Sequence, residues 1–162
     1  RRVLFRSSFS RIVPMMRSEG LGLMVWSPLV GGLLSGKYDF AADGAVSGEG
    51  RRAKLDFPRA DKQLAAAAVA AMRPMAEARG VGVAAIALAW LLHQQVTGSV
   101  IVGARKPEQL AQNLAASDIV LTGEELAVLD AVARPDDEYP AWAIKAQDQR
   151  HGFRVSPRRP ER

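Results

Sequence analysis

A short apolar segment that runs into a glycine-rich loop constrains the fold of this chain most strongly. Residues 21–26, Leu-Gly-Leu-Met-Val-Trp, are nearly all apolar, which is typical of a parallel strand buried on both faces. Pro28 ends such a strand because it lacks an N–H donor and fixes its own φ angle. The following residues 29–38 supply small side chains, backbone N–H groups and one cation, Lys37. This combination favours a phosphate-bearing ligand that lies close to the main chain.

A second segment points to the same kind of ligand. Residues 99–102, Ser-Val-Ile-Val, predict another strand, and Pro107 fits the first turn of the helix that we expect after it. Arg105 and Lys106 then lie at the positive end of the helix dipole, where cations are unfavourable unless an anion neutralises them. We therefore expect a phosphate site in which the Arg105 guanidinium is the bidentate partner.

Three blocks of sequence follow one another at characteristic separations. They are Trp-Ser-Pro-Leu, Gly-Leu-Leu and Gly-Lys-Tyr within 26–38, Ala-Leu-Ala-Trp-Leu-Leu at 87–92, and Gly-Ala-Arg, Pro-Glu-Gln-Leu and Asn-Leu within 103–114. Together they resemble the last third to half of the aldo-keto reductase family. The resemblance implies an α/β fold, namely the C-terminal portion of a (β/α)8 TIM barrel, dominated here by helices. It also implies NADP(H) bound at the carboxyl ends of the strands and the reduction of aldehydes or ketones to alcohols.

The same resemblance implies which residues bind the cofactor. Trp26 lies beside the nicotinamide ring. The pyrophosphate loop comprises Ser27, Pro28, Leu29, Gly31, Lys37 and Tyr38, and the adenosine and 2′-phosphate pocket comprises Gly103, Arg105, Gln109, Gln112 and Asn113. The family often has an acidic residue at the position of Gln112. From its position in a long loop, Arg52 is expected to fold over the pyrophosphate, and a solvated arginine is the equally open alternative.

No catalytic residue is expected in this chain. The family uses an Asp, Tyr, Lys and His set on early strands of the barrel, and the two tyrosines here, Tyr38 and Tyr139, do not match the catalytic position. We expect no metal site, because the chain has no cysteine and only two histidines. Of these, His93 is interpreted as a surface or dipole-facing residue, and Trp90 as a core anchor.

Length and charge extend this interpretation. A complete barrel takes ~250 residues, whereas the chain has 162. We expect residues 1–11 to be an unmatched N-terminal extension, 12–150 the NADP(H)-binding part of the barrel, and 151–162 a basic disordered tail. The net charge of +5 is concentrated in the two ends, which argues against nucleic-acid binding. The absence of cysteine fits a reducing cytoplasm, and no apolar run approaches the ~20 residues of a membrane span.

The function that these observations favour is that of an NADP(H)-dependent oxidoreductase, present as a fragment that is inactive by itself. The expected partners are the dinucleotide and a small carbonyl substrate, without nucleic acid or membrane. Self-association is expected through strand edges that lack their neighbours. Two alternatives remain open at this stage: a catalytically silent nucleotide-binding module, and a helical interaction protein that keeps its strands only for packing.

Capping residues and periodicity predict five helices. They cover residues 11–19, 62–79, 83–95, 107–116 and 123–133. Asp61 caps the second helix, and Thr122-Gly-Glu-Glu125 is a capping box before the last. Pro74 should kink or divide the second helix. In residues 39–58 the apolar side chains recur with neither helical nor strand spacing, which predicts a long loop.

Overall fold

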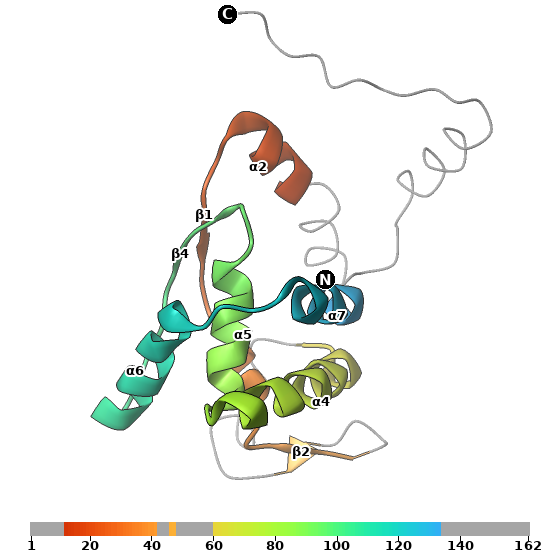
Figure 1. The fold of residues 1–162 in the computed structure, drawn as a ribbon, viewed down its shortest axis with the longest axis vertical. Coiled ribbons are helices and arrows are strands. Elements are labelled where there is room, and N and C mark those ends of the chain that lie inside the picture. The colour runs from red at the N-terminus through yellow and green to blue at the C-terminus, as the bar shows by residue number, and fades with distance from the viewer. Residues whose placement is uncertain (1–11, 42–45, 48–59, 134–162) are drawn as a thin grey trace, which may run out of the picture.

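A ribbon of two parallel strands, with helices packed along one side of it, forms the part of the fold that positions the site. The computed structural model describes residues 12–41, 46–47 and 60–133. Strands β1 (Leu23–Val25) and β4 (Thr97–Val100) pair in parallel, with Met24 opposite Ser99 and Val25 opposite Val100. In Figure 1 the two strands run side by side next to α5. The parallel direction requires a long crossover, which contains the helices α4 (Lys62–Arg79) and α5 (Val83–Leu92).

The remaining described elements surround this unit. They are α2 (Val13–Glu19), the 3-10 segments η2 (Val30–Ser35) and η3 (Ala115–Asp118), the short strands β2 (Asp39–Phe40) and β3 (Val46–Ser47), and the helices α6 (Pro107–Leu114) and α7 (Gly123–Ala133). Strands β2 and β3 pair antiparallel. The loop predicted over 39–58 therefore contains two short paired strands, and its residues 42–45 and 48–58 lie outside the described residues. The fold class is α/β and helix-rich, and the described strands do not close a barrel.

Local capping signals place the helices where the sequence predicts them. The Asp61 Oδ1 atom accepts hydrogen bonds from the N–H groups of Gln63 (3.1 Å) and Leu64 (3.0 Å) at the start of α4. The same helix ends at Gly80, whose φ of 62° is left-handed. Of the two predicted effects of Pro74, a kink or a division, the division does not occur, because α4 is one continuous element through that residue. Pro74 and Ala70, whose carbonyl loses its i+4 donor, are both exposed, so water can hydrate this carbonyl.

The core lies where α4, α5 and α7 meet. Its buried side chains are Val69, Met72, Met75, Ala76, Val83, Ile86, Ala87, Ala89, Leu121 and Leu129. Helix α5 is buried on most sides, as its composition predicts, although it ends at Leu92 rather than at residue 95. A second buried cluster, Leu33, Tyr38 and Ala65, joins the segment after β1 to α4.

The strands differ from their predictions in length and burial. The first is shorter than 21–26, and it is not buried on both faces, since Met24 and Trp26 are each 67% exposed. Successive side chains of a strand point to opposite faces, and among the described residues only the face toward α5 is covered. The second strand begins at Thr97, two residues earlier than predicted. Gly22 and Gly98 face one another at the start of this pairing, and a Cβ atom on Gly22 would lie in ordinary van der Waals contact, 3.6 Å from the Gly98 Cα atom.

No single helix in the described part of the chain is long and apolar enough to cross a membrane. By length and composition alone, α4 and α5 pass this test together, and the chain bends by 101° between them.

Candidate functional site

Two loops leave the parallel ribbon at the same edge. Trp26 follows β1 directly, and Ile101 follows β4. The Ile101 N–H group still donates to the Val25 carbonyl oxygen (2.9 Å), so the pairing continues one residue beyond the end of β4. Residues 27–38, here called the glycine loop, and residues 103–106, here called the arginine loop, therefore begin beside one another. In open α/β sheets ligands bind at this carboxyl edge of the strands.

Helix α5 holds both loops against one buried cluster. Ala85 and Leu88 of α5 and Ala116 of η3 form this cluster. Leu29 of the glycine loop packs against it, and so does Val102, which directly precedes the arginine loop. Apolar contacts thus anchor the glycine loop, and the residue that precedes the arginine loop, to the same side of α5.

The backbone of the glycine loop has an unusual conformation. Ser27 (φ 54°) and Val30 (φ 52°) both have positive φ angles, and for a β-branched residue such as Val30 this is a genuine outlier. Positive angles continue at Gly31, Gly32 and Gly36. Hydrogen bonds within the loop hold it, from Val30 N–H to the Ser27 carbonyl (2.9 Å) and from Ser35 Oγ to the Gly32 carbonyl (2.6 Å). Backbone strain that the surroundings maintain is typical of ligand-binding segments.

The cation of the glycine loop lies across the loop itself. Lys37 is exposed, and its Nζ atom is 5.0 Å from the centre of the Tyr38 ring. A Cβ atom on Gly32 would lie 3.8 Å from the same Nζ atom. Tyr38, in contrast, is only 2% exposed and packs with Leu33 and Ala65. The Tyr38 ring therefore belongs to the core beneath Lys37, because burial of a large aromatic ring is strongly favourable. The expected contact of Tyr38 with the cofactor stays a prediction.

The arginine loop leads into α6. Arg105 and Lys106 are both exposed, and Pro107 is in the first turn of the helix as predicted. The Gln109 side-chain oxygen accepts a hydrogen bond from the Arg105 N–H group (3.1 Å). Gln109, Gln112 and Asn113 are three and four residues apart, so they share one face of α6.

The residues at this edge fit a phosphate-bearing ligand with flat rings. The glycine and arginine loops each contribute an exposed cation, Lys37 and Arg105, and Trp26 adds an exposed indole. Arg52, the other predicted contact, lies outside the described residues. Within the described ranges, no group of three His, Cys, Asp or Glu side chains could hold a metal ion.

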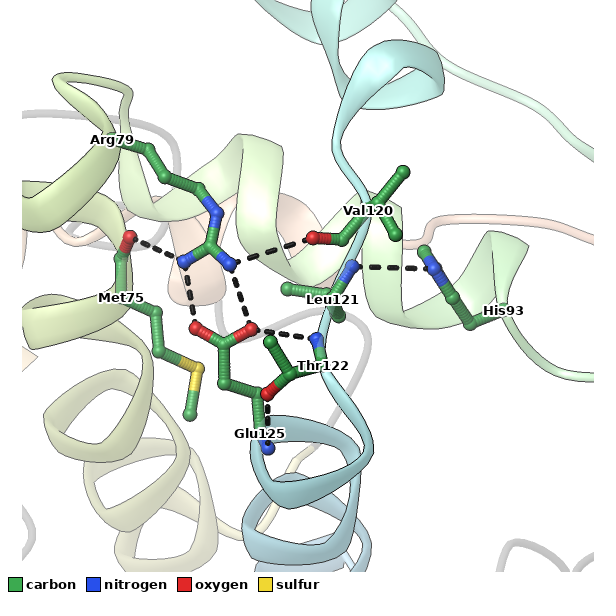
Figure 2. Close-up of polar contacts among 7 residues, drawn as sticks. All are labelled: Met75, Arg79, His93, Val120, Leu121, Thr122 and Glu125. Carbon is green, nitrogen blue, oxygen red and sulfur yellow. Dashed lines mark hydrogen bonds and ion pairs between the residues drawn. The ribbon is translucent and has the colours of Figure 1, made fainter.

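A polar network away from this edge was not predicted. Figure 2 shows Arg79 of α4 and Glu125 of α7 joined by two hydrogen bonds of 2.7 Å. The predicted capping box is confirmed: Thr122 N–H donates to the Glu125 carboxylate (2.8 Å), and Glu125 N–H donates to the Thr122 hydroxyl (3.2 Å). The hydrogen bond from Arg79 and, next, that from the Thr122 N–H lower the pKa of Glu125. This network joins helices and contains none of the predicted cofactor residues.

His93 and Trp90 complete the connection between α5 and α7. The His93 Nδ1 atom is 2.8 Å from the Ala89 carbonyl, and its Nε2 atom accepts from the Leu121 N–H group (3.3 Å) (Figure 2). The proton of the neutral ring is therefore on Nδ1, facing the end of the helix as expected. The ring is half-buried, however, and is not a surface residue. Trp90 packs against the core as predicted, and its indole N–H donates to Asp130 (2.8 Å).

Comparison with known proteins identifies the family. The model of the aldo/keto reductase family matches residues 3–134. The chain belongs to the aldo/keto reductase family. The match begins and ends earlier than the range of 12–150 expected from the sequence blocks. Members of this family generally use nicotinamide cofactors and fold as (β/α)8 barrels.

Relatives whose names give different functions support the same family. The chain is 34% identical over 131 residues to a probable voltage-gated potassium channel subunit beta of Oryza sativa subsp. japonica, which covers 77% of the chain and 39% of that protein. It is 31% identical over 124 residues to the L-glyceraldehyde 3-phosphate reductase of Escherichia coli (strain K12), and this match covers 75% of the chain and 36% of that protein. It is 29% identical over 133 residues to the NADH-specific methylglyoxal reductase of the same strain, and this match covers 81% of the chain and 39% of that protein. The chain thus spans less than half the length of these relatives.

Proposed function

We propose that this chain is the cofactor-binding part of a cytoplasmic, NADP(H)-dependent oxidoreductase that reduces aldehydes or ketones to alcohols. One observation carries the proposal: the glycine loop and the arginine loop begin at the same edge of a parallel ribbon and pack on the same cluster of α5 and η3. Each loop brings a cation and backbone N–H groups, so a ligand with several phosphate groups can bind to both loops at once.

The choice of NADP(H) rests on Arg105. Its side chain is exposed just before the N-terminus of α6, where a guanidinium and the helix dipole attract the same anion. The 2′-phosphate distinguishes NADP(H) from NAD(H), so a cation placed here selects for the phosphorylated form. One relative is named as NADH-specific, which makes cofactor preference an experimental question for this chain.

The bound cofactor would supply a hydride to the carbonyl carbon. The residues of this chain would bind and orient it, with Trp26 beside the nicotinamide ring. The pyrophosphate would be held by Ser27, Pro28, Leu29, Gly31, Lys37 and Tyr38, and the adenosine and 2′-phosphate by Gly103, Arg105, Gln109, Gln112 and Asn113. The proton donor that such a reduction requires is proposed to come from outside this chain. The isolated chain would then bind dinucleotide without turning over aldehydes.

Titration with NADPH and with NADH, followed by cofactor fluorescence, tests the proposal. A charged hydrogen bond contributes roughly 1.5–3 kcal/mol, so Arg105→Ala should weaken NADPH binding by about one to two orders of magnitude. NADH binding should be nearly unchanged. Arg73→Ala is the matched control, because Arg73 is an exposed arginine within α4. Equal losses for both cofactors would show that Arg105 serves the fold and not the 2′-phosphate.

The second candidate function is a catalytically silent nucleotide-binding module. The similarity to proteins named as potassium channel beta subunits favours a binding role in an assembly. The two candidates differ in what the full-length protein does with NADPH and a panel of aldehydes. Turnover would support the reductase, and dinucleotide binding without turnover would support the silent module.

A further inference from the structure

The face of the ribbon that points away from α5 presents an apolar pair at the site edge. Val25 and Val100 are half-buried, and Val100 packs against the cluster of α5 and η3. Because side chains alternate along a strand, the residues that follow Val25 and Val100 point to the face away from α5. The register pairs Val25 with Val100, and the hydrogen bond from Ile101 N–H to the Val25 carbonyl continues the pairing beyond them. Extending the register by one residue places Trp26 beside Ile101.

Trp26 and Ile101 lie where the two strands lead into the two loops. Trp26 directly precedes the glycine loop, and Ile101 is separated from the arginine loop only by Val102, which packs on α5. The Ile101 side chain is 46% exposed, although it belongs to the residue type most often buried. A β-branched side chain has few rotamers, so it presents a fixed apolar surface and loses little conformational entropy when a ligand covers it.

We propose that Ile101 is a positioning residue for the nicotinamide ring. Together with the Trp26 indole it would form an apolar floor on which the ring lies, while the two loops hold the phosphates. This inference rests on the proposed function and adds a residue to it, since the sequence motifs include Trp26 but not Ile101. A floor made by two adjacent strands restricts how the flat ring can tilt, which an indole alone would not do.

Two ligands separate this role from a general effect on the site. NADPH contains the nicotinamide ring, and 2′-phospho-ADP-ribose contains the same adenosine, 2′-phosphate and pyrophosphate without it. Ile101→Ala removes apolar surface under the ring, so we expect NADPH affinity to fall by about tenfold. Affinity for 2′-phospho-ADP-ribose should stay the same. Ile101→Val should restore most of the NADPH affinity because it keeps the branched Cβ.

Met15→Ala is the matched control, because Met15 is equally exposed, at 46%, but lies on α2. Neither ligand should be affected by it. An equal loss of both ligands on Ile101→Ala would overturn the inference and make Ile101 a residue of the fold, and so would unchanged binding of both. If the unsubstituted chain binds 2′-phospho-ADP-ribose and NADPH with equal affinity, the nicotinamide ring contributes nothing to binding, and only this inference fails. If it binds neither, the proposed function fails as well.

Discussion

Substitution of Gly36 by alanine should be the most damaging single-methyl change in the glycine loop. Gly36 has a φ of 79°, and a Cβ atom placed on it would lie 2.9 Å from the Val83 Cγ2 atom. Val83 is buried at the start of α5, so it has little room to move. Both the backbone angle and the space at this position therefore require glycine.

The magnitude follows from these two effects. A left-handed conformation costs an L-residue about 1–2 kcal/mol, and the insertion of a methyl group into a packed site costs about 1–3 kcal/mol. Gly36→Ala should therefore lower the free energy of unfolding by about 2–5 kcal/mol. Gly20 also has a positive φ, of 66°, but nothing lies within 4 Å of its Cβ position. Gly20→Ala should consequently show only the backbone part, about 1–2 kcal/mol.

Urea unfolding followed by circular dichroism measures both variants under the same conditions. The double variant Gly36→Ala with Val83→Ala tests the steric part, because it removes the methyl at 2.9 Å. It leaves the Val83 Cβ atom at 3.0 Å, so the relief should be partial, with a coupling energy of about 0.5–2 kcal/mol. If Gly36→Ala is no more destabilising than Gly20→Ala, the argument that Val83 leaves no room for a side chain at position 36 is wrong.

Two further predictions concern the helices and the strand edges. The pKa of Glu125 is lowered, chiefly by its hydrogen bond from Arg79. The ionised carboxylate therefore stabilises the fold at pH values above the ordinary carboxyl pKa. This stabilisation is lost as the pH falls through the lowered pKa of the folded protein. The difference in unfolding free energy between the native chain and Glu125→Gln should therefore narrow on acidification, and a difference independent of pH would contradict the ion pair. The ribbon of β1 and β4 should promote self-association through its open edges, which sedimentation would detect as a rising average mass with concentration. A monomer that unfolds cooperatively would refute this.

The amino-acid sequence by itself determined the parts of the fold that depend on neighbouring residues. Asp61 caps α4 and Gly80 ends it through hydrogen bonds that span a few positions, and the Thr122–Glu125 capping box is equally local. The family could also be predicted from the sequence, because two of its three motif blocks contain loops whose glycines, proline and cations have particular backbone and phosphate-binding roles. The contacts of the predicted cofactor residues with a dinucleotide stay a prediction.

The tertiary structure alone decided which side of each element is covered and what lies against it. Tyr38 follows Lys37 in a loop motif, yet its ring is buried against Leu33 and Ala65. The partner of Glu125 is Arg79, 46 positions away, and His93 bonds to Leu121 across 28 positions. Local spacing cannot specify such pairs, because they form only when packing of the core brings α4, α5 and α7 together. The strand that the sequence predicts as buried on both faces is half-exposed for the same reason: a run of apolar residues favours burial, but burial itself depends on the elements that pack against it.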